Sequence, residues 1–201
     1  MPGQKVPEAI RRRQILDAAL QVALRDGIAG VTVRAVAAEA GLSHGLVLFH
    51  FKRKDPLVQA LLASVLTEML TGDVAPADPG VPRALDRLRL RLQQEMARLA
   101  REPGRVRLLL ECWALGARHP ALREQVSEAF ERYRAGFRPV IEEVLREEAP
   151  ALPGVSATGL AALAVGLISQ CVVQELIDPD RFPVAEYLST AETLLGALAA
   201  R

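Results

Sequence analysis

The stretch TVRAVAAEAGLSHGLVLFHFKRK, from Thr32 to Lys54, predicts two short helices joined by a tight turn. Thr32 and Ser43 can each cap the start of a helix, because a hydroxyl accepts a hydrogen bond from a first-turn amide that lacks a partner within the helix. Gly41 can take the left-handed conformation that ends the first helix. The buried side of that helix is expected to carry Val33, Val36, Ala37 and Ala40, which recur at helical spacing. A joint as short as Leu42–Ser43 makes the helices cross steeply, so the stretch predicts a helix-turn-helix.

The outward side of the second helix is the part of this unit expected to meet DNA. The N-terminus of a helix offers free amides and a partial positive charge, which suit a phosphate. Three cations, Lys52–Lys54, follow the helix at once and can neutralise phosphates. Taken alone, these residues also fit a small helical hairpin with a solvated basic end.

The same run resembles the DNA-binding signature of TetR-family transcriptional regulators, and the resemblance extends from Arg12 through Leu57. The matching positions are Thr32, Val36, Ala37, Ala40, Gly41, Leu42, Ser43, Gly45, Phe49, His50, Phe51, Lys52 and Lys54. Two positions depart from the family pattern. Val47 replaces the usual leucine, and Leu48 replaces a tyrosine whose hydroxyl meets a phosphate. Leucine cannot make that contact, and it can instead touch a thymine methyl group or a sugar.

Position and resemblance together imply a set of DNA-contacting residues. Arg34 lies on the exposed side of the first helix and can bind guanine O6 and N7, or a phosphate. His44 lies in the leading turn of the second helix, where an inserted helix meets base edges. Lys52 and Lys54 are expected to position the protein on phosphates. The full predicted set is Arg34, Ser43, His44, Gly45, Leu48, Phe49, His50, Lys52 and Lys54.

Composition predicts an all-α protein with a basic N-terminal part. The chain has 201 residues, of which 50% are hydrophobic and only 4% aromatic, and its abundant Ala, Leu, Arg and Glu favour helices. The net charge of +1 is uneven. Residues 1–57 hold nine Lys and Arg against five Asp and Glu, which leaves −3 for the remainder. A basic N-terminal part followed by a mildly acidic remainder suits a protein whose N-terminal part binds nucleic acid.

Two domains are expected: a three-helix DNA-binding domain at residues 1–54, and a helical ligand-binding and dimerisation domain at residues 55–201. The expected helices are Glu8–Arg25, the two of the helix-turn-helix, Pro56–Thr71, Arg83–Arg101, Val106–Ala117, Ala121–Glu148, Ala157–Ile177 and Val184–Ala200. Pro139 is expected to kink or split the helix that contains it. Residues 1–7 are expected to form a mobile arm and residues 72–82 a loop.

The last two helices are expected to form a homodimer through Ala157–Ala200. Gly159, Ala162 and Gly166 keep one side of the first of them flat enough for another helix to approach. In TetR-like proteins the corresponding helices pair with those of a second subunit. A single helix-turn-helix also buries too little surface to specify an operator.

A mainly apolar effector pocket is predicted among inward-facing residues of the second domain. Its expected lining is Leu92, Met96, Leu109, Trp113, Phe130, Tyr133, Phe137 and Gln170. Buried polar atoms require partners, and a ligand or trapped water could supply them for Trp113, Tyr133 and Gln170. No inward cluster of charges is evident, so the expected ligand is small, neutral or weakly charged, and largely hydrophobic. Ordinary core packing is the alternative role of these side chains.

Other classes of function fit the sequence less well. An enzyme needs a nucleophile with a base, paired carboxylates or metal ligands, but two of the three histidines belong to the DNA unit. We therefore expect no catalysis, cofactor or metal. A helical adaptor and a redox-responsive regulator using Cys112 or Cys171 remain as alternatives. Glu175 interrupts the most apolar helix, so no membrane span is expected. The prediction is a cytoplasmic repressor that binds double-stranded operator DNA and is released by a small hydrophobic effector.

Overall fold

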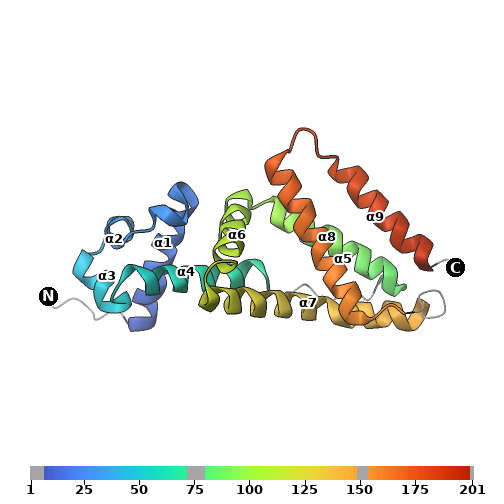
Figure 1. The fold of residues 1–201 in the computed structure, drawn as a ribbon, viewed down its shortest axis with the longest axis horizontal. Coiled ribbons are helices and arrows are strands. Elements are labelled where there is room, and N and C mark those ends of the chain that lie inside the picture. The colour runs from blue at the N-terminus through green and yellow to red at the C-terminus, as the bar shows by residue number, and fades with distance from the viewer. Residues whose placement is uncertain (1–6, 72–79, 149–153, 200–201) are drawn as a thin grey trace. The chain divides into compact units, whose positions relative to one another are not determined.

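The computed structural model describes residues 7–71, 80–148 and 154–199, and within these ranges the regular structure is α-helical without a strand (Figure 1). The all-α prediction is confirmed. The helices are α1 (Glu8–Gly30), α2 (Val33–Ala40), α3 (His44–Phe51), α4 (Lys54–Met69), α5 (Ala84–Ala100), α6 (Pro103–Gly116), α7 (Pro120–Glu148), α8 (Ala157–Ile177) and α9 (Val184–Ala199). Most of the predicted arm, most of the predicted loop at residues 72–82, and Ala200 lie outside the described residues.

The chain divides into two compact units that do not correspond to one cut in the sequence. The first unit contains Met1–Glu68 and Arg107–Val126, and the second contains Met69–Val106 and Ser127–Arg201. The first unit therefore adds most of α4, the end of α6 and the start of α7 to the residues 1–54 expected as the DNA-binding domain. Each of these three helices belongs partly to one unit and partly to the other.

In the first unit, α1 packs against α2, and α2 against α3, around a small apolar core. The fully buried side chains include Ile15, Ala19, Val22, Val36 and Val47, each with 0% of its surface exposed. The helical dihedral angles of α1 are broken at Gly27, where φ is 71° and ψ is 176°. The sequence predicted that this helix ends at Arg25, two residues before the break. A residue with a Cβ would be strained at position 27.

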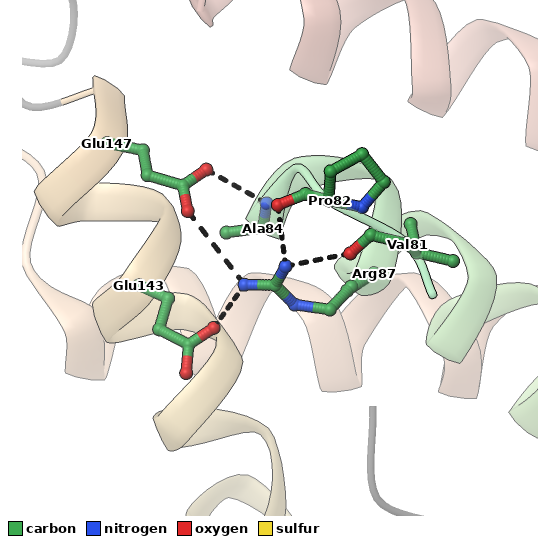
Figure 2. A network of polar contacts seen from close by, with 6 residues as sticks. All are labelled: Val81, Pro82, Ala84, Arg87, Glu143 and Glu147. Carbon is green, nitrogen blue, oxygen red and sulfur yellow. Dashed lines mark hydrogen bonds and ion pairs between the residues drawn. The ribbon is translucent and has the colours of Figure 1, made fainter. Parts of the chain in front are cut away.

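In the second unit, α7 supplies a cap for α5. Arg83 at the N-cap of α5 makes no side-chain capping hydrogen bond. The free amide of Ala84 instead donates to Glu147 Oε2 at 2.9 Å. Arg87 donates to the carbonyls of Val81 and Pro82, each at 2.9 Å, and pairs with Glu143 and Glu147 of α7 (Figure 2). This network fixes the start of α5 against the end of α7.

A second polar group is buried deeper between α5 and α7. Glu95 is only 4% exposed, and Arg98 donates to it through Nε at 2.9 Å and through a terminal nitrogen at 2.6 Å. Tyr133 of α7 donates its hydroxyl proton to Glu95 Oε1 at 2.7 Å. Burial, together with the charge of Glu95, raises the pKa of Tyr133 well above its usual value. The guanidinium of Arg91 lies 4.9 Å from the centre of the Phe137 ring. Burial lowers the pKa of Arg91.

Several predicted helix boundaries were wrong, and proline explains two of them. Helices α6 and α7 begin at Pro103 and Pro120, earlier than expected. Proline suits the first helical position, since its missing N–H would have no partner there. Helix α4 begins at Lys54 and ends at Met69. Pro139 does not split α7, which runs unbroken from Pro120 to Glu148; the proline removes one backbone hydrogen bond, and the buried side chains around it hold the helix together.

Candidate nucleic-acid interface

The turn between α2 and α3 has the caps that the sequence predicted. Thr32 Oγ1 accepts a hydrogen bond from the amide of Ala35 at 3.1 Å, and Ser43 Oγ accepts one from the amide of Leu46 at 3.2 Å. Gly41 lies in the left-handed region, with φ 65° and ψ 32°. These local bonds fix where α3 begins and leave its first amides directed outward.

Helix α3 divides into a buried side and an exposed side. Val47 is fully buried and Phe51 is 2% exposed, so both belong to the core of the first unit. Phe49, in contrast, is 76% exposed. Among the predicted DNA contacts, Leu48 and His50 are half-buried, and the others are exposed: Arg34, Ser43, His44, Gly45, Phe49, Lys52 and Lys54.

Two backbone features shape this exposed side. An added Cβ at Gly45 would meet nothing within 4 Å, so packing within the chain does not require glycine there. Lys52 ends α3 with φ 57° and ψ −44°, the one described residue other than glycine with a positive φ. Its amide closes the helix on the carbonyl of Leu48 at 2.7 Å. A lysine in this region of φ/ψ space is held there at some energetic cost.

Side chains of α1 hold the helix-turn-helix in place, a role that the sequence analysis did not predict. Arg12 donates to the carbonyl of His50 at 3.3 Å, and its guanidinium lies 4.3 Å from the centre of the Phe51 ring. Gln14 donates to the carbonyl of Ala40 at 3.0 Å. Both acceptors lie at helix C-termini, where carbonyls lack helical partners. The only sequence signal was the Arg11–Arg13 run, whose cations could equally have been solvated.

The eight predicted effector-binding residues are divided between the two units. Leu92, Met96, Tyr133 and Phe137 are buried in the second unit, and Phe130 is half-buried there. Leu109 and Trp113 belong to the first unit. Gln170 is exposed on α8, so the prediction that it faces inward was wrong. An apolar helix carries little periodic signal to show which side is buried. The hydroxyl of Tyr133 already has Glu95 as a partner.

Apolar cavities lie within the described residues of the second unit, and two of them are large enough for a small ligand. The larger, about 240 Å³, lies between the ends of α5 and α8 and the start of α6. Its lining is Leu99, Ala100, Pro103, Val106, Val172, Glu175, Leu176 and Pro179. Glu175 is the only ionisable group among them. The smaller, about 160 Å³, is lined only by Leu and Ala of α5, α8 and α9, including Leu163 and Leu194.

Neither cysteine has the properties of a redox sensor. Cys112 and Cys171 are both 0% exposed. Burial, with a smaller effect of Glu111, raises the pKa of Cys112 to about 12, and burial with Glu175 raises that of Cys171 to about 11. A reactive cysteine needs an accessible thiolate, so these thiols are protonated and protected at neutral pH. This disfavours the redox-responsive alternative.

Comparison with known proteins identifies the family. Residues 15–61 match the model for bacterial regulatory proteins of the tetR family, and residues 84–200, more than half of the chain, match the C-terminal domain of BetI-type transcriptional repressors. The chain is 30% identical over 164 residues to the HTH-type transcriptional regulator BetI of Burkholderia thailandensis. That match covers 79% of this chain and 80% of the relative.

Solved structures show the same fold. A transcriptional regulator from Pseudomonas aeruginosa PAO1 superimposes with a TM-score of 0.77 at 23% identity, over 98% of this chain and 93% of that one. A regulator from Saccharomonospora viridis, solved in complex with choline, has a TM-score of 0.71 at 19% identity and covers 94% of this chain and 96% of its own. The protein therefore belongs to the TetR family and is a DNA-binding transcriptional regulator with a BetI-type C-terminal domain.

Proposed function

We propose that this regulator represses transcription by inserting α3 into the major groove of double-stranded operator DNA, and that a small ligand releases it. The observation that carries the first part is the exposed side of α3. A capped helix presents His44, Gly45 and Phe49 to solvent, and lysines follow at its end. An aromatic side chain that is 76% exposed beside cations gives this surface both apolar and positively charged groups, which suit the sugars and phosphates of DNA.

The proposed contacts divide into base readers and phosphate binders. Arg34 and His44 reach base edges, whereas Lys52, Lys54 and the α3 amides behind Ser43 bind phosphates. The open space at Gly45 lets the backbone approach the groove closely. Leu48, Phe49 and His50 supply sugar, thymine-methyl or phosphate contacts. The positive φ of Lys52 supports its role, because strained backbone is concentrated at functional sites.

The proposed DNA-binding form is a homodimer paired through Ala157–Ala200. Helix α8 has an exposed face made of Gly159, Ala162, Leu163, Gly166 and Gln170, and Leu163 is 65% exposed. TetR-family regulators act as dimers. By length and mean hydropathy (1.8) α8 could also cross a membrane; pairing with a second copy covers its apolar face in the cytoplasm instead. The two helix-turn-helix units of the dimer then bind half-sites about 34–36 Å apart.

The proposed effector site is the 240 Å³ cavity that contains Glu175. Its walls are otherwise aliphatic, and in the described residues no cation pairs with this carboxylate. Such a cavity suits a small apolar molecule that carries a positive charge. The choline bound by the Saccharomonospora viridis regulator has this chemistry and supports the proposal. Release requires that the ligand bind the DNA-free geometry more tightly than the DNA-bound one.

An electrophoretic mobility shift tests both parts. A duplex selected from a random pool by the wild-type protein serves as the operator, and choline and longer alkyl-trimethylammonium ions are then titrated against the complex. We expect at least one of these cations to release the wild-type protein from the operator. Glu175→Leu should not be released, and its operator affinity without any cation should equal that of the wild type. Failure to select any duplex would refute the DNA-binding part. Equal release of wild type and Glu175→Leu would refute the effector site.

A further inference from the structure

The end of α1, the helix that holds the helix-turn-helix, is bonded to a side chain of α6. The break at Gly27 removes the following amide, that of Ile28, from the regular hydrogen bonding of α1. This amide donates instead to Glu111 Oε2, 3.0 Å away and 83 residues later in the chain. An added Cβ on Gly27 would lie 3.5 Å from Glu111 Oε1 and 3.7 Å from Oε2. The carboxylate therefore lies directly against the broken turn.

Glu111 is a charged residue in a partly buried position. It is half-buried on α6, beside the fully buried Cys112. Within the described part of the chain, its only polar partner is the Ile28 amide, and no Lys or Arg pairs with it. Removing a carboxylate partly from water without a cation is costly. An apolar side chain there would leave the Ile28 amide without an acceptor, so the carboxylate fastens the end of α1 to α6.

The same helix also lines the proposed effector cavity. Pro103 and Val106, in the first turn of α6, belong to the second unit and line that cavity. Glu111 lies five residues further along α6, in the first unit. Glu111 is therefore on the same helix as two residues that line that cavity.

We propose that Glu111 is a positioning residue for operator binding, which holds the end of α1 on α6 through the Ile28 amide. Through Arg12 and Gln14, α1 in turn holds the C-termini of α3 and α2. Loss of the Glu111 bond frees the end of α1, and the two recognition helices of a dimer then match the half-site spacing for less of the time. The inference rests on the proposed operator binding.

The test compares three variants with the wild type on the selected operator and on an unrelated duplex. Glu111→Leu removes the acceptor, and Glu111→Gln keeps an oxygen that can accept from Ile28. Glu124→Leu removes an exposed acid of the same unit and controls for the change in net charge. Exchange of the Ile28 amide hydrogen, measured by NMR, reports the bond itself. Thermal melting shows that each variant is folded at the assay temperature.

We expect Glu111→Leu to bind the operator about tenfold more weakly than Glu124→Leu, a ratio typical of removing one hydrogen bond to a charged acceptor. Binding to the unrelated duplex should not change, the Ile28 amide should exchange faster, and Glu111→Gln should restore most of the affinity. If Glu111→Leu does not fold, Glu111→Asp, whose carboxylate falls short of the amide, replaces it. Equal operator affinities for Glu111→Leu and Glu124→Leu would overturn the proposal, as would equal loss on both duplexes. Failure of the wild type to select a duplex would instead refute the proposed function.

Discussion

Replacing Tyr133 with Phe measures the buried polar contact between α5 and α7. The substitution removes only the hydroxyl that donates to Glu95 Oε1 at 2.7 Å and keeps the ring that packs edge-on against Phe137. Glu95 retains both bonds from Arg98, so no buried charge is left unpaired. The substitution should therefore lower the free energy of unfolding by the contribution of one hydrogen bond to a charged group, about 1.5–3 kcal/mol. Breaking a buried ion pair would lower it further.

For a chain of this size, each kcal/mol lowers the melting temperature by about 2–4 °C, so Tyr133→Phe should melt about 3–12 °C below the wild type. Tyr187→Phe is the matched control. Tyr187 is half-buried, and its hydroxyl donates to the neutral carbonyl of Leu167 at 2.9 Å. Removing this hydroxyl should lower the free energy of unfolding by only about 0.5–1.5 kcal/mol. Circular dichroism at one fixed protein concentration gives both values. If Tyr133→Phe lowers the melting temperature no more than Tyr187→Phe does, the hydrogen bond between Tyr133 and Glu95 does not stabilise the fold to the extent expected.

The same contact predicts a pH dependence with a defined sign. The pKa of Tyr133 is raised in the folded protein, so its contribution to stability is fully present below about pH 10, the pKa of an unfolded tyrosine. That contribution is lost as the pH rises from there toward the folded pKa, because the unfolded chain releases the proton first. The stability difference between wild type and Tyr133→Phe should therefore shrink above about pH 10. A difference that grows with pH would contradict this assignment.

Three further predictions concern DNA binding and assembly. Lys54→Ala should weaken binding to all duplexes alike and reduce the slope of log affinity against log salt by about one unit, because the protein then neutralises one phosphate fewer; an unchanged slope would argue against a phosphate-binding role. His44→Ala should change the preference among selected operators, and an equal loss on every duplex would argue against base reading. Gly166→Asp, at a site where an added Cβ meets nothing within 4 Å, should produce monomers by sedimentation and abolish operator binding, whereas a stable dimer would move the interface elsewhere.

The helix-turn-helix could be predicted almost completely from the sequence because its signals are local. The hydroxyls of Thr32 and Ser43 bond to amides three residues away, and Gly41 acts through its own backbone. The contacts that hold this unit to α1 could not be predicted in the same way. Arg12 reaches an acceptor 38 residues away and Gln14 one 26 residues away. Long polar side chains of this kind give no periodic signal that distinguishes a contact from solvation.

The regulatory domain was harder to predict because two of its helices give misleading patterns. Helix α8 is apolar on nearly every side, so its sequence does not show that Gln170 and Leu163 lie on the exposed face. Helix α5 shows the opposite problem. Glu95 has Arg98 three residues later, which is typical of a solvated ion pair, yet it is 4% exposed and accepts a hydrogen bond from Tyr133 of α7.

This contact changes where an effector should be sought. The sequence indicates that the buried hydroxyl of Tyr133 needs a partner, either a ligand or a trapped water. That reasoning holds, but Glu95 of the same chain satisfies the requirement. Glu175 differs from Tyr133 in this respect. Its carboxylate lines an apolar cavity and has no cation partner among the described residues. The polar group that lacks a partner, and not the one that is most buried, is the better indicator of a ligand, and here it also predicts the sign of the ligand's charge.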